Sequence, residues 1–377
     1  MTRKLRVLHC LETVGSGGVE QRRLSLAQHL DSDRYEQRLV CTQAIGGLPE
    51  LLEQAGCSIN TVGRFHGIFD QKRYRTTLEI IREFRPHIIH GAVYEGVALA
   101  AVCGRLGRVP VVLGEETSDP SNRRWKGHLL YRSFAGLCHH MVGVSPAVTD
   151  YLRRKIRLPV HKVTLINNGV AEKPRANPQE IAAVRERLGL PQDAFVIGTV
   201  GRLLDSHKRA SDLIRAMPRI IVDCPTAFLL VVGTGRDEQA LQCLASELDV
   251  ADQVLFASYQ ADTQPYYEVM DVFTMASAHE AFGLVLVEAM FTELPVVATR
   301  VGGIPGVVDD GATGFLVDPY QPQALAERIL RLVNDPSARR AMGQAGRRRA
   351  LSHFSSQRYV ADVDALYRRL ISARNIA

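Results

Sequence analysis

Several features that would place this chain of 377 residues in a special class are missing. No apolar run approaches the roughly 20 residues needed to cross a bilayer, and the run after the basic start is too short for a secretory signal. The seven cysteines form no C-x-x-C pair and mostly lie within apolar runs, at positions 10, 41, 57, 103, 138, 224 and 243. We therefore expect reduced, buried thiols in a cytoplasmic protein, and neither a disulfide framework nor a cysteine metal site.

Aromatic residues make up only 6% of the chain, and the net charge of +6 is a moderate bias. This surplus is too small to predict nucleic acid as a partner. It suits an enzyme of anionic substrates, or one that contacts an anionic membrane at its inner face. The single Trp lies in the basic stretch 122–128, where interfacial membrane contact is one interpretation and plain solvation is the other.

What the chain does contain is a regular alternation of apolar strands and amphipathic helices. The runs 5–11 and Phe195–Val200 each open such a series, and the polar, proline-bearing stretch 171–177 separates the two series. We predict an α/β protein with two doubly wound domains, residues 1–172 and 173–354, and a last helix within 355–377.

One stretch of the second domain carries most of the functional signal. Val272–Met275 is an apolar run typical of a buried strand, and Leu284–Phe291 has helical periodicity. Gly283 lies at the join, where a tight turn needs glycine. Glu280 is therefore expected on a strand-to-helix loop, and Glu288 one to two turns into the helix.

The opening turn of that helix offers free N–H groups to an anion, while the flanking carboxylates can accept hydrogen bonds from sugar hydroxyls. This combination suits a nucleotide-sugar site. A helix-dipole partner and a solvated helix face would be the alternative for two isolated glutamates.

Polar residues in the first domain also follow predicted strands. His90 lies at one strand end with Tyr94 just after it, and Glu115 and Glu116 follow the next strand. Open α/β sheets keep their sites at this edge, so these residues are candidates for acceptor recognition. Core packing, capping or a loop without function would explain the same residues. The Gly15–Gly18 loop predicts either a phosphate approach or only a tight turn.

The motifs Glu-Ala-Phe-Gly-Leu (280–284), Glu-Ala-Met (288–290), Pro-Val-Val-Ala-Thr (295–299) and Gly-Gly-Ile-Pro (302–305) resemble the donor-site signature of family-4 glycosyltransferases of the GT-B fold. The E-x(7)-E pattern of that family matches Glu280 and Glu288. The resemblance implies two Rossmann-like domains facing a cleft, with the last helix crossing back to the first domain. It also implies a retaining, metal-independent transferase that needs no cofactor.

The resemblance further implies a UDP- or GDP-sugar as donor and a glycan or polyprenyl-linked acceptor, in cell-surface polysaccharide synthesis. Arg202 and Lys208 match the positions that grip the diphosphate. Glu280 would contact the donor sugar and Glu288 the ribose. Backbone groups would come from Phe282, Gly283, Leu284, Gly17 and Gly18. We expect no metal, because the C-terminal half shows no Asp-x-Asp motif of the kind that holds one in other transferases.

Three positions depart from the family pattern. Ala92 stands where many members have a functional histidine, Glu293 where they often have Gly, and Gly306 where they often have Glu. Other interpretations of the chain are a nucleotide-sugar epimerase of the same fold, a phosphorylase, and a non-catalytic nucleotide-binding scaffold.

Overall fold

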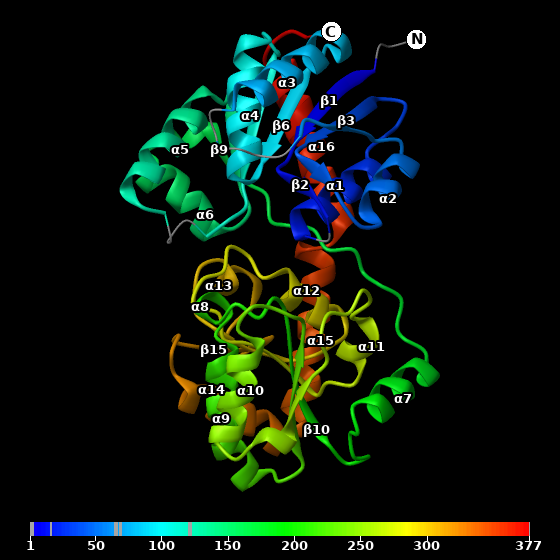
Figure 1. Ribbon diagram of the computed structural model, residues 1–377, viewed down its shortest axis with the longest axis vertical. Helices are drawn as coiled ribbons and strands as arrows, with labels where there is room; N and C mark the ends of the chain where they lie inside the picture. Colours follow the sequence, from blue (N-terminus) through cyan, green and yellow to red (C-terminus); the bar gives the residue numbers. More distant parts are fainter. Residues whose placement is uncertain (1–3, 16, 64–66, 68–69, 120–122, 377) are drawn as a thin grey trace. The chain divides into compact units, whose positions relative to one another are not determined.

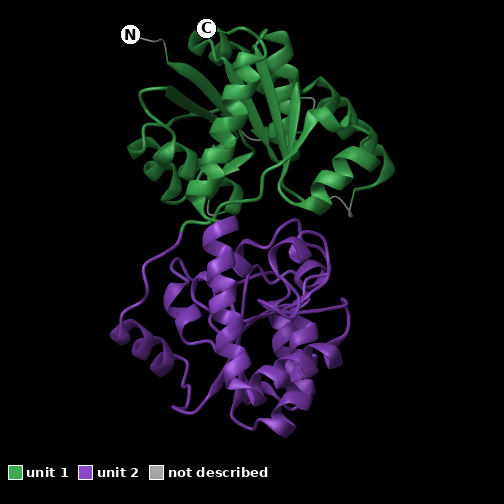
Figure 2. Cartoon of the chain, turned by 180° about the vertical axis from the view of Figure 1, so that it is seen from behind, with its two compact units in different colours: residues 1–171, 355–377 green, residues 172–354 purple. Residues whose placement is uncertain are grey.

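The computed structural model describes residues 4–15, 17–63, 67, 70–119 and 123–376, which form two compact units. Unit 1 comprises Met1–Ala171 with Ser355–Ala377, and unit 2 comprises Glu172–Phe354; Figure 2 colours them green and purple. In each unit, helices cover a parallel sheet (Figure 1). The predicted α/β fold with two Rossmann-like units is thus confirmed.

The described part of unit 1 contains a seven-stranded parallel sheet in the order β5-β3-β1-β6-β7-β8-β9. Its strands are β1 (Leu5–Cys10), β3 (Tyr35–Cys41), β5 (Ser58–Thr61), β6 (Ile88–Ala92), β7 (Val111–Glu116), β8 (His140–Gly143) and β9 (Val163–Leu165), while β2 (Thr13–Val14) and β4 (Gln43–Ala44) pair separately. The helices are α1 (Gly18–His29), α2 (Leu48–Gln54), α3 (Gln71–Phe84), α4 (Val93–Leu106), α5 (Trp125–Leu137), α6 (Pro146–Asp150), the π-helix η2 (Tyr151–Lys155), the short 3₁₀ helix η3 (Val160–Lys162) and α16 (Ser356–Ser372).

Both faces of the sheet are buried at its central strands β1, β6 and β7, which explains the apolar residues at 7–8, 88–89 and 111–113. Successive strand residues point to opposite faces. Val7 and Ile88 accordingly join one hydrophobic cluster with α1 and α16, whereas Leu8 and Ile89 join another with α3, α4 and α5.

The last helix, α16, packs within unit 1 although it follows unit 2 in the sequence. Its Tyr359, Val363 and Tyr367 are buried in the cluster that contains Val7 and Ile88. The Ser355 side chain caps its first turn, accepting from the Arg358 N–H at 3.4 Å. The return of the chain end to the first unit, which the family resemblance implied, is confirmed.

Unit 2 is described throughout and holds a six-stranded parallel sheet in the order β12-β11-β10-β13-β14-β15. Its strands are β10 (Phe195–Val200), β11 (Ala227–Val232), β12 (Val254–Phe256), β13 (Val272–Met275), β14 (Val296–Thr299) and β15 (Gly314–Val317). Its helices are α7 (Pro178–Arg187), α8 (Asp205–Lys208), α9 (Ala210–Asp223), α10 (Glu238–Glu247), the short 3₁₀ helix η4 (Ala251–Gln253), α11 (Gln264–Glu268), α12 (Leu284–Phe291), α13 (Ile304–Val307), α14 (Pro322–Asn334) and α15 (Pro336–His353).

The strand order reverses once in each unit. In unit 2 the chain runs outward from β10 through β11 to β12, and then restarts at β13 on the other side of β10. Unit 1 has the same reversal between β1 and β6. Ligands of open α/β sheets bind outside the carboxyl ends of the strands at such a switch point, which directs attention to the loops after β10 and β13.

Three local expectations were wrong. Strand β7 extends through Glu115 and Glu116, which pair with Val142 and Gly143 of β8 and so do not lie in a loop. The apolar pattern predicts a helix over residues 97–106, but α4 begins at Val93, so Tyr94 lies in its first turn. The sequence predicts Lys208 in the loop after the strand that ends at Val200, but Lys208 ends the one-turn helix α8.

Candidate active site

Three loops of unit 2 are tied together at the carboxyl ends of β10, β13 and β14. The Ala278 N–H donates to the His207 carbonyl at 2.8 Å, which joins the first two loops. Thr299 donates its hydroxyl to the Ser277 carbonyl at 2.6 Å, and the Gly303 N–H donates to the Glu280 carbonyl at 2.9 Å. The backbone that carries Glu280 is therefore held by both neighbouring loops.

Lys208 and Glu280 form the central ion pair of this region. Lys208 Nζ lies 2.6 Å from Glu280 Oε2, with 34% of the Lys208 side chain and 14% of the Glu280 side chain exposed. The other oxygen, Glu280 Oε1, accepts from the Phe282 N–H at 3.4 Å. Two of the predicted catalytic residues are thus in direct contact, at the switch point of the sheet.

Two glycines determine the path of the Glu280 loop. Gly283 has φ +95°, a left-handed conformation that favours glycine, and it starts α12 immediately after the loop. At Gly302 a Cβ atom would collide with the Glu280 carbonyl oxygen. The Phe282 ring packs inward, edge-to-face on Phe354 with ring centroids 5.6 Å apart. Phe282 can therefore offer its backbone, but not its ring, to a ligand at this loop.

Arg202 follows β10 and is exposed. It lines a small pocket of about 20 Å³ together with Lys208, Ser277 and the end of β10. The structure therefore brings Arg202 and Lys208 to one place, and Glu280 joins them through its ion pair with Lys208.

Glu288 lies on α12 and is oriented by a tyrosine that sequence reasoning missed. The Tyr267 hydroxyl, on α11, donates to Glu288 Oε2 at 2.8 Å. Burial raises the pKa of Glu288, while the hydrogen bond from Tyr267 favours its charged form. No sequence pattern marks Tyr267, because it is 21 residues away and belongs to a different helix.

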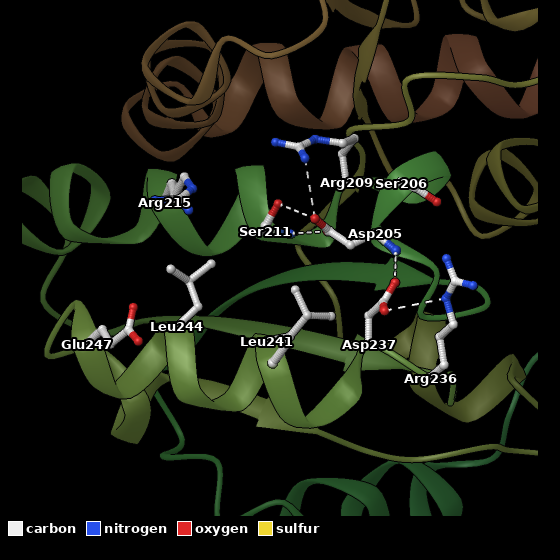
Figure 3. Close-up of a pocket in the computed structure, with 11 residues that line it drawn as sticks. Asp205, Ser206, Arg209, Ser211, Arg215, Arg236, Asp237, Leu241, Leu244 and Glu247 are labelled. Carbon is white, nitrogen blue, oxygen red and sulfur yellow. Dashed lines mark hydrogen bonds and ion pairs between the residues drawn. The ribbon is translucent and has the colours of Figure 1, made fainter.

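A network of carboxylates fixes the one-turn helix α8, which ends at Lys208 (Figure 3). Asp205 accepts from the Ser211 N–H at 2.9 Å and from the Ser211 hydroxyl at 2.7 Å, and Arg209 lies 3.4 Å from it. Asp237 accepts from the Asp205 N–H at 2.7 Å. These residues line a wider pocket of about 490 Å³ between α9 and α10, which contains neither Lys208 nor Glu280. This pocket is therefore separate from the small pocket that Arg202 and Lys208 line.

In unit 1, α1 begins at Gly18, one residue before the helix start at Val19 that the sequence predicts. Gly17 is the residue before the first turn, and a Cβ there would collide with the Glu20 carboxylate, which folds back over it. Burial raises the pKa of Glu20. The N-terminus of α1 is thus covered in part by a carboxylate of its own first turn.

His90 and Glu115 lie in a buried network around two arginines. Glu115 Oε2 lies 2.6 Å from Arg23 Nη2, and Glu115 Oε1 lies 3.4 Å from Arg22 Nη1. His90 is 3.5 Å from Glu115 through Nε2 and 2.7 Å from the Tyr367 hydroxyl through Nδ1. Only 1% of the Glu115 side chain is exposed. Burial argues against direct contact of either residue with an acceptor.

The environment of this network lowers the pKa of both groups, which favours the charged form of Glu115 and the neutral form of His90. The two guanidinium groups hold the pKa of Glu115 well below its usual range, although burial alone would raise it. Burial, with the nearby Arg23, lowers the pKa of His90 to about 4. His90 is therefore neutral at neutral pH while Glu115 is charged, so within this pair only Glu115 compensates the charge of the buried arginines.

Glu116 is equally buried and pairs with Arg123 through two hydrogen bonds, one of them at 3.2 Å between Arg123 Nη2 and Glu116 Oε1. The Arg123 guanidinium also lies over the Tyr131 ring, 4.4 Å from its centroid. Tyr94 stacks on Tyr131 with ring centroids 5.6 Å apart. Glu116 thus anchors the start of α5, and Tyr94 is the most accessible of the four acceptor candidates.

The C-terminal half does contain one Asp-x-Asp sequence, Asp362-Val363-Asp364, contrary to the expectation. It lies inside α16, where Asp362 pairs with Arg358 and Asp364 accepts from the Tyr35 hydroxyl at 2.7 Å. Among the described residues, no three His, Cys, Asp or Glu side chains are grouped to hold a metal ion. Nor does any helix in the described ranges have the length and apolarity to cross a bilayer.

Two family models together match most of the chain. The model for glycosyltransferase family 4 matches residues 16–173, and the model for glycosyl transferases group 1 matches residues 180–349. The lipopolysaccharide core biosynthesis glycosyltransferase LpsE of Rhizobium meliloti is 34% identical over 177 residues, 47% of this chain and 51% of that protein. The D-inositol 3-phosphate glycosyltransferase of Corynebacterium jeikeium is 37% identical over 193 residues, 49% and 45% of the two chains. These matches span about half the length of each relative.

Solved structures extend the likeness to the whole fold. HepE of Anabaena, crystallised with UDP and glucose, superimposes with a TM-score of 0.86 over 97% of this chain and 100% of that chain, at 20% identity. WaaG, a glycosyltransferase of lipopolysaccharide biosynthesis, gives a TM-score of 0.75 over 95% and 99%. Together with the two family models and the Glu280–Glu288 motif, this identifies the chain as a member of the group 1, family-4 glycosyltransferases of the GT-B fold.

Proposed function

We propose that the protein is a retaining, metal-independent glycosyltransferase that moves a sugar from a UDP- or GDP-sugar to a glycan or polyprenyl-linked acceptor in cell-surface polysaccharide synthesis. The observation that carries the proposal is the Lys208–Glu280 pair at the switch point of unit 2, with Arg202 lining the same pocket as Lys208. Relatives named for lipopolysaccharide core and capsular polysaccharide biosynthesis support this class of product.

The chemistry requires fixed positive charge where the diphosphate leaves. Arg202 can form a forked, bidentate contact with phosphate oxygens, whereas Lys208 supplies a compact charge. The first turn of α12, which Gly283 opens, adds N–H groups and the positive end of a helix dipole. These groups would stabilise the growing charge without a metal ion.

The two glutamates would position the sugar and the nucleoside. Glu280 would accept from donor-sugar hydroxyls near the reacting carbon, and Glu288, held by Tyr267, would accept from the ribose hydroxyls. Lys208 Nζ lies 2.6 Å from Glu280 Oε2. A bound donor would therefore have its diphosphate on the Lys208 side of this pair and its sugar on the Glu280 side. Backbone groups of Phe282, Gly283 and Leu284 would complete the donor site.

The residues that would contact the acceptor differ from those expected from the sequence. Glu115, Glu116 and His90 would act through the packing of unit 1, whereas Tyr94 and the Gly17–Gly18 turn remain candidates for direct contact. A lipid-linked acceptor would also require peripheral contact with an anionic membrane on the cytoplasmic side.

Release of nucleoside diphosphate from a panel of UDP- and GDP-sugars, with and without an added glycan acceptor, tests the proposal. We expect acceptor-dependent release that persists in excess EDTA and that Glu280→Ala reduces at least about a hundred-fold, since one lost preorganised contact costs that much in many active sites. Glu280→Gln is the matched control for side-chain volume. Acceptor-independent isomerisation of the donor would indicate an epimerase, and nucleotide binding without turnover would indicate a scaffold.

A further inference from the structure

We propose that the outer face of α5 in unit 1 is a docking surface for an anionic lipid membrane. This face, here called the α5 face, comprises Arg124, Trp125, Lys126, Leu129, Arg132 and Leu137. The proposed function motivates it only in that a lipid-linked acceptor would bring the enzyme to a membrane. The surface itself is argued from exposure, charge and packing.

The apolar part of the α5 face is unusually exposed. Trp125 is 70% exposed, Leu129 59% and Leu137 39%. Trp125 and Leu129 are four residues apart and therefore lie on the same side of the helix. The opposite side, with Tyr131, Phe134 and Ala135, is buried in the cluster shared with α3 and α4. The helix thus has a second apolar side that points away from its own core.

Positive charge is concentrated in the segment of the chain that contains this face, although Arg123 within it is paired with Glu116. Residues 120–171 contain nine Lys or Arg and a single acidic residue, Asp150, whereas the whole chain has a net charge of +6. This one segment therefore carries more than the entire positive surplus of the protein. Asp150 lies 3.8 Å from Arg154, so it does not offset the charge of the α5 face itself.

The helix is held firmly, so the exposed side chains have a defined orientation. Arg123 fixes its start through Glu116 and the Tyr131 ring. His128 lies 3.0 Å from the Tyr151 hydroxyl, which places η2 next to the first turns of α5. Burial and then the nearby Lys155 lower the pKa of His128, in agreement with a short distance between η2 and α5. Lys155 of η2 is exposed and extends the basic surface, whereas the exposed Arg154 pairs with Asp150. Figure 1 shows α5 and α6 at one flank of unit 1.

This combination favours a lipid surface over a nucleic acid or an acidic protein. An indole ring and leucine side chains enter the boundary between headgroups and acyl chains, while surrounding Lys and Arg attract anionic headgroups. A nucleic-acid surface would use the charges and the indole but would leave Leu129 and Leu137 without a partner. Polyuridylate RNA is therefore the competing ligand in the test.

The chain has one Trp, so its fluorescence reports this face alone. We would add vesicles of phosphatidylcholine with 30% phosphatidylglycerol, or of phosphatidylcholine only, to the full-length protein. We expect a blue shift of the Trp125 emission and quenching by brominated lipid with the anionic vesicles only, weakened by salt. Each removed charge should reduce partitioning about five-fold, so the triple variant Arg124→Glu/Lys126→Glu/Arg132→Glu should lose at least about a hundred-fold.

The matched control reverses three exposed arginines of unit 2, Arg215→Glu/Arg340→Glu/Arg348→Glu, and should leave vesicle binding unchanged. Leu129→Ala should weaken binding without altering its salt dependence. Absence of an emission shift with anionic vesicles, an equal loss in both triple variants, or binding of polyuridylate RNA but not vesicles would each overturn the proposal. Titration of UDP and GDP into the same samples keeps the two proposals distinct, because nucleotide binding tests the donor site and not the α5 face.

Discussion

The two units share one sheet architecture but use the polar residues at their strand ends differently. In unit 2, Lys208 and Glu280 are partly exposed and pair with each other, and Arg202 lies beside them on the surface. In unit 1, Glu115 and Glu116 occupy comparable places at the end of β7, yet both are buried and paired with arginines from other elements. A carboxylate at the end of a parallel strand can therefore bind a substrate or stabilise the fold, and the burial of its partners decides between these roles.

This difference has a physical origin in the surroundings of each carboxylate. Glu115 faces two guanidinium groups that have left water, so its charge is needed to keep them in the interior. Glu280 pairs with one lysine, Lys208, whose side chain is 34% exposed. The charge of Glu280 is therefore available to a ligand.

Removal of Glu115 should destabilise unit 1 strongly. Glu115→Ala leaves Arg22 and Arg23 buried without their shared carboxylate, and breaking such a pair typically costs about 3–5 kcal/mol. Glu280→Ala should cost less than about 1 kcal/mol, because its partner is partly exposed. Chemical denaturation with hydrogen exchange of each unit measures both values. If Glu115→Ala were as mild as Glu280→Ala, the contrast would be wrong and Glu115 would again be an acceptor candidate.

Arg202 and Lys208 should act on the diphosphate of the donor. Each charge-assisted contact to phosphate is worth about 1.5–3 kcal/mol, so Arg202→Ala and Lys208→Ala should each weaken nucleoside diphosphate binding about ten- to a hundred-fold. Binding of the bare nucleoside should change little. Isothermal titration of both ligands, with the exposed Arg215→Ala as control, measures this. Equal losses for the two ligands would assign these residues to the base or to the fold.

The buried histidines should make unit 1 sensitive to mild acid. His90 has a folded pKa of about 4, below its unfolded value near 6.5, so its contribution to stability is present above pH 6.5. As the pH falls from 6.5 toward 4, the free energy of unfolding therefore decreases by about 1.4 kcal/mol per pH unit. His9, His139 and His140 also have lowered pKa values in the same unit. His90→Gln should therefore reduce the slope of unfolding free energy between pH 6.5 and 5 without abolishing it, and an unchanged slope would contradict this assignment.

The smallest effect is expected at Glu293, where the family often has Gly. Glu293 has φ +62°, a left-handed conformation that costs a non-glycine residue about 1 kcal/mol. Its ion pairs with Arg347 and Arg175, at 3.7 and 3.8 Å, are long and partly exposed. Glu293→Gly should thus be neutral or stabilising by up to about 1 kcal/mol in thermal unfolding. Glu293→Ala separates the two effects, since it removes the ion pairs and keeps the strain.

Much of the fold could be predicted because it is encoded locally. The apolar runs of β10 and β13 and the periodicity of α12 predicted their bounds without error. The order of strand, loop and helix then placed Glu280 and Arg202 at the carboxyl edge of a sheet, since all parallel strands end on the same side. The predicted boundaries failed where polar residues continue a strand, as in β7, because burial of Glu115 and Glu116 depends on distant arginines.

The alternation of elements and the spacing of the Glu280–Glu288 motif follow from the amino-acid sequence alone. The contacts between side chains, in contrast, become visible only in the folded chain. Lys208 and Glu280 are 72 positions apart, and Arg23 and Glu115 are 92 apart. A periodic pattern records which face of an element is apolar, but it carries no information on the partner that a charged group finds across the sheet. The roles of Glu115 and Glu280 therefore separated only when burial and contact partners were known.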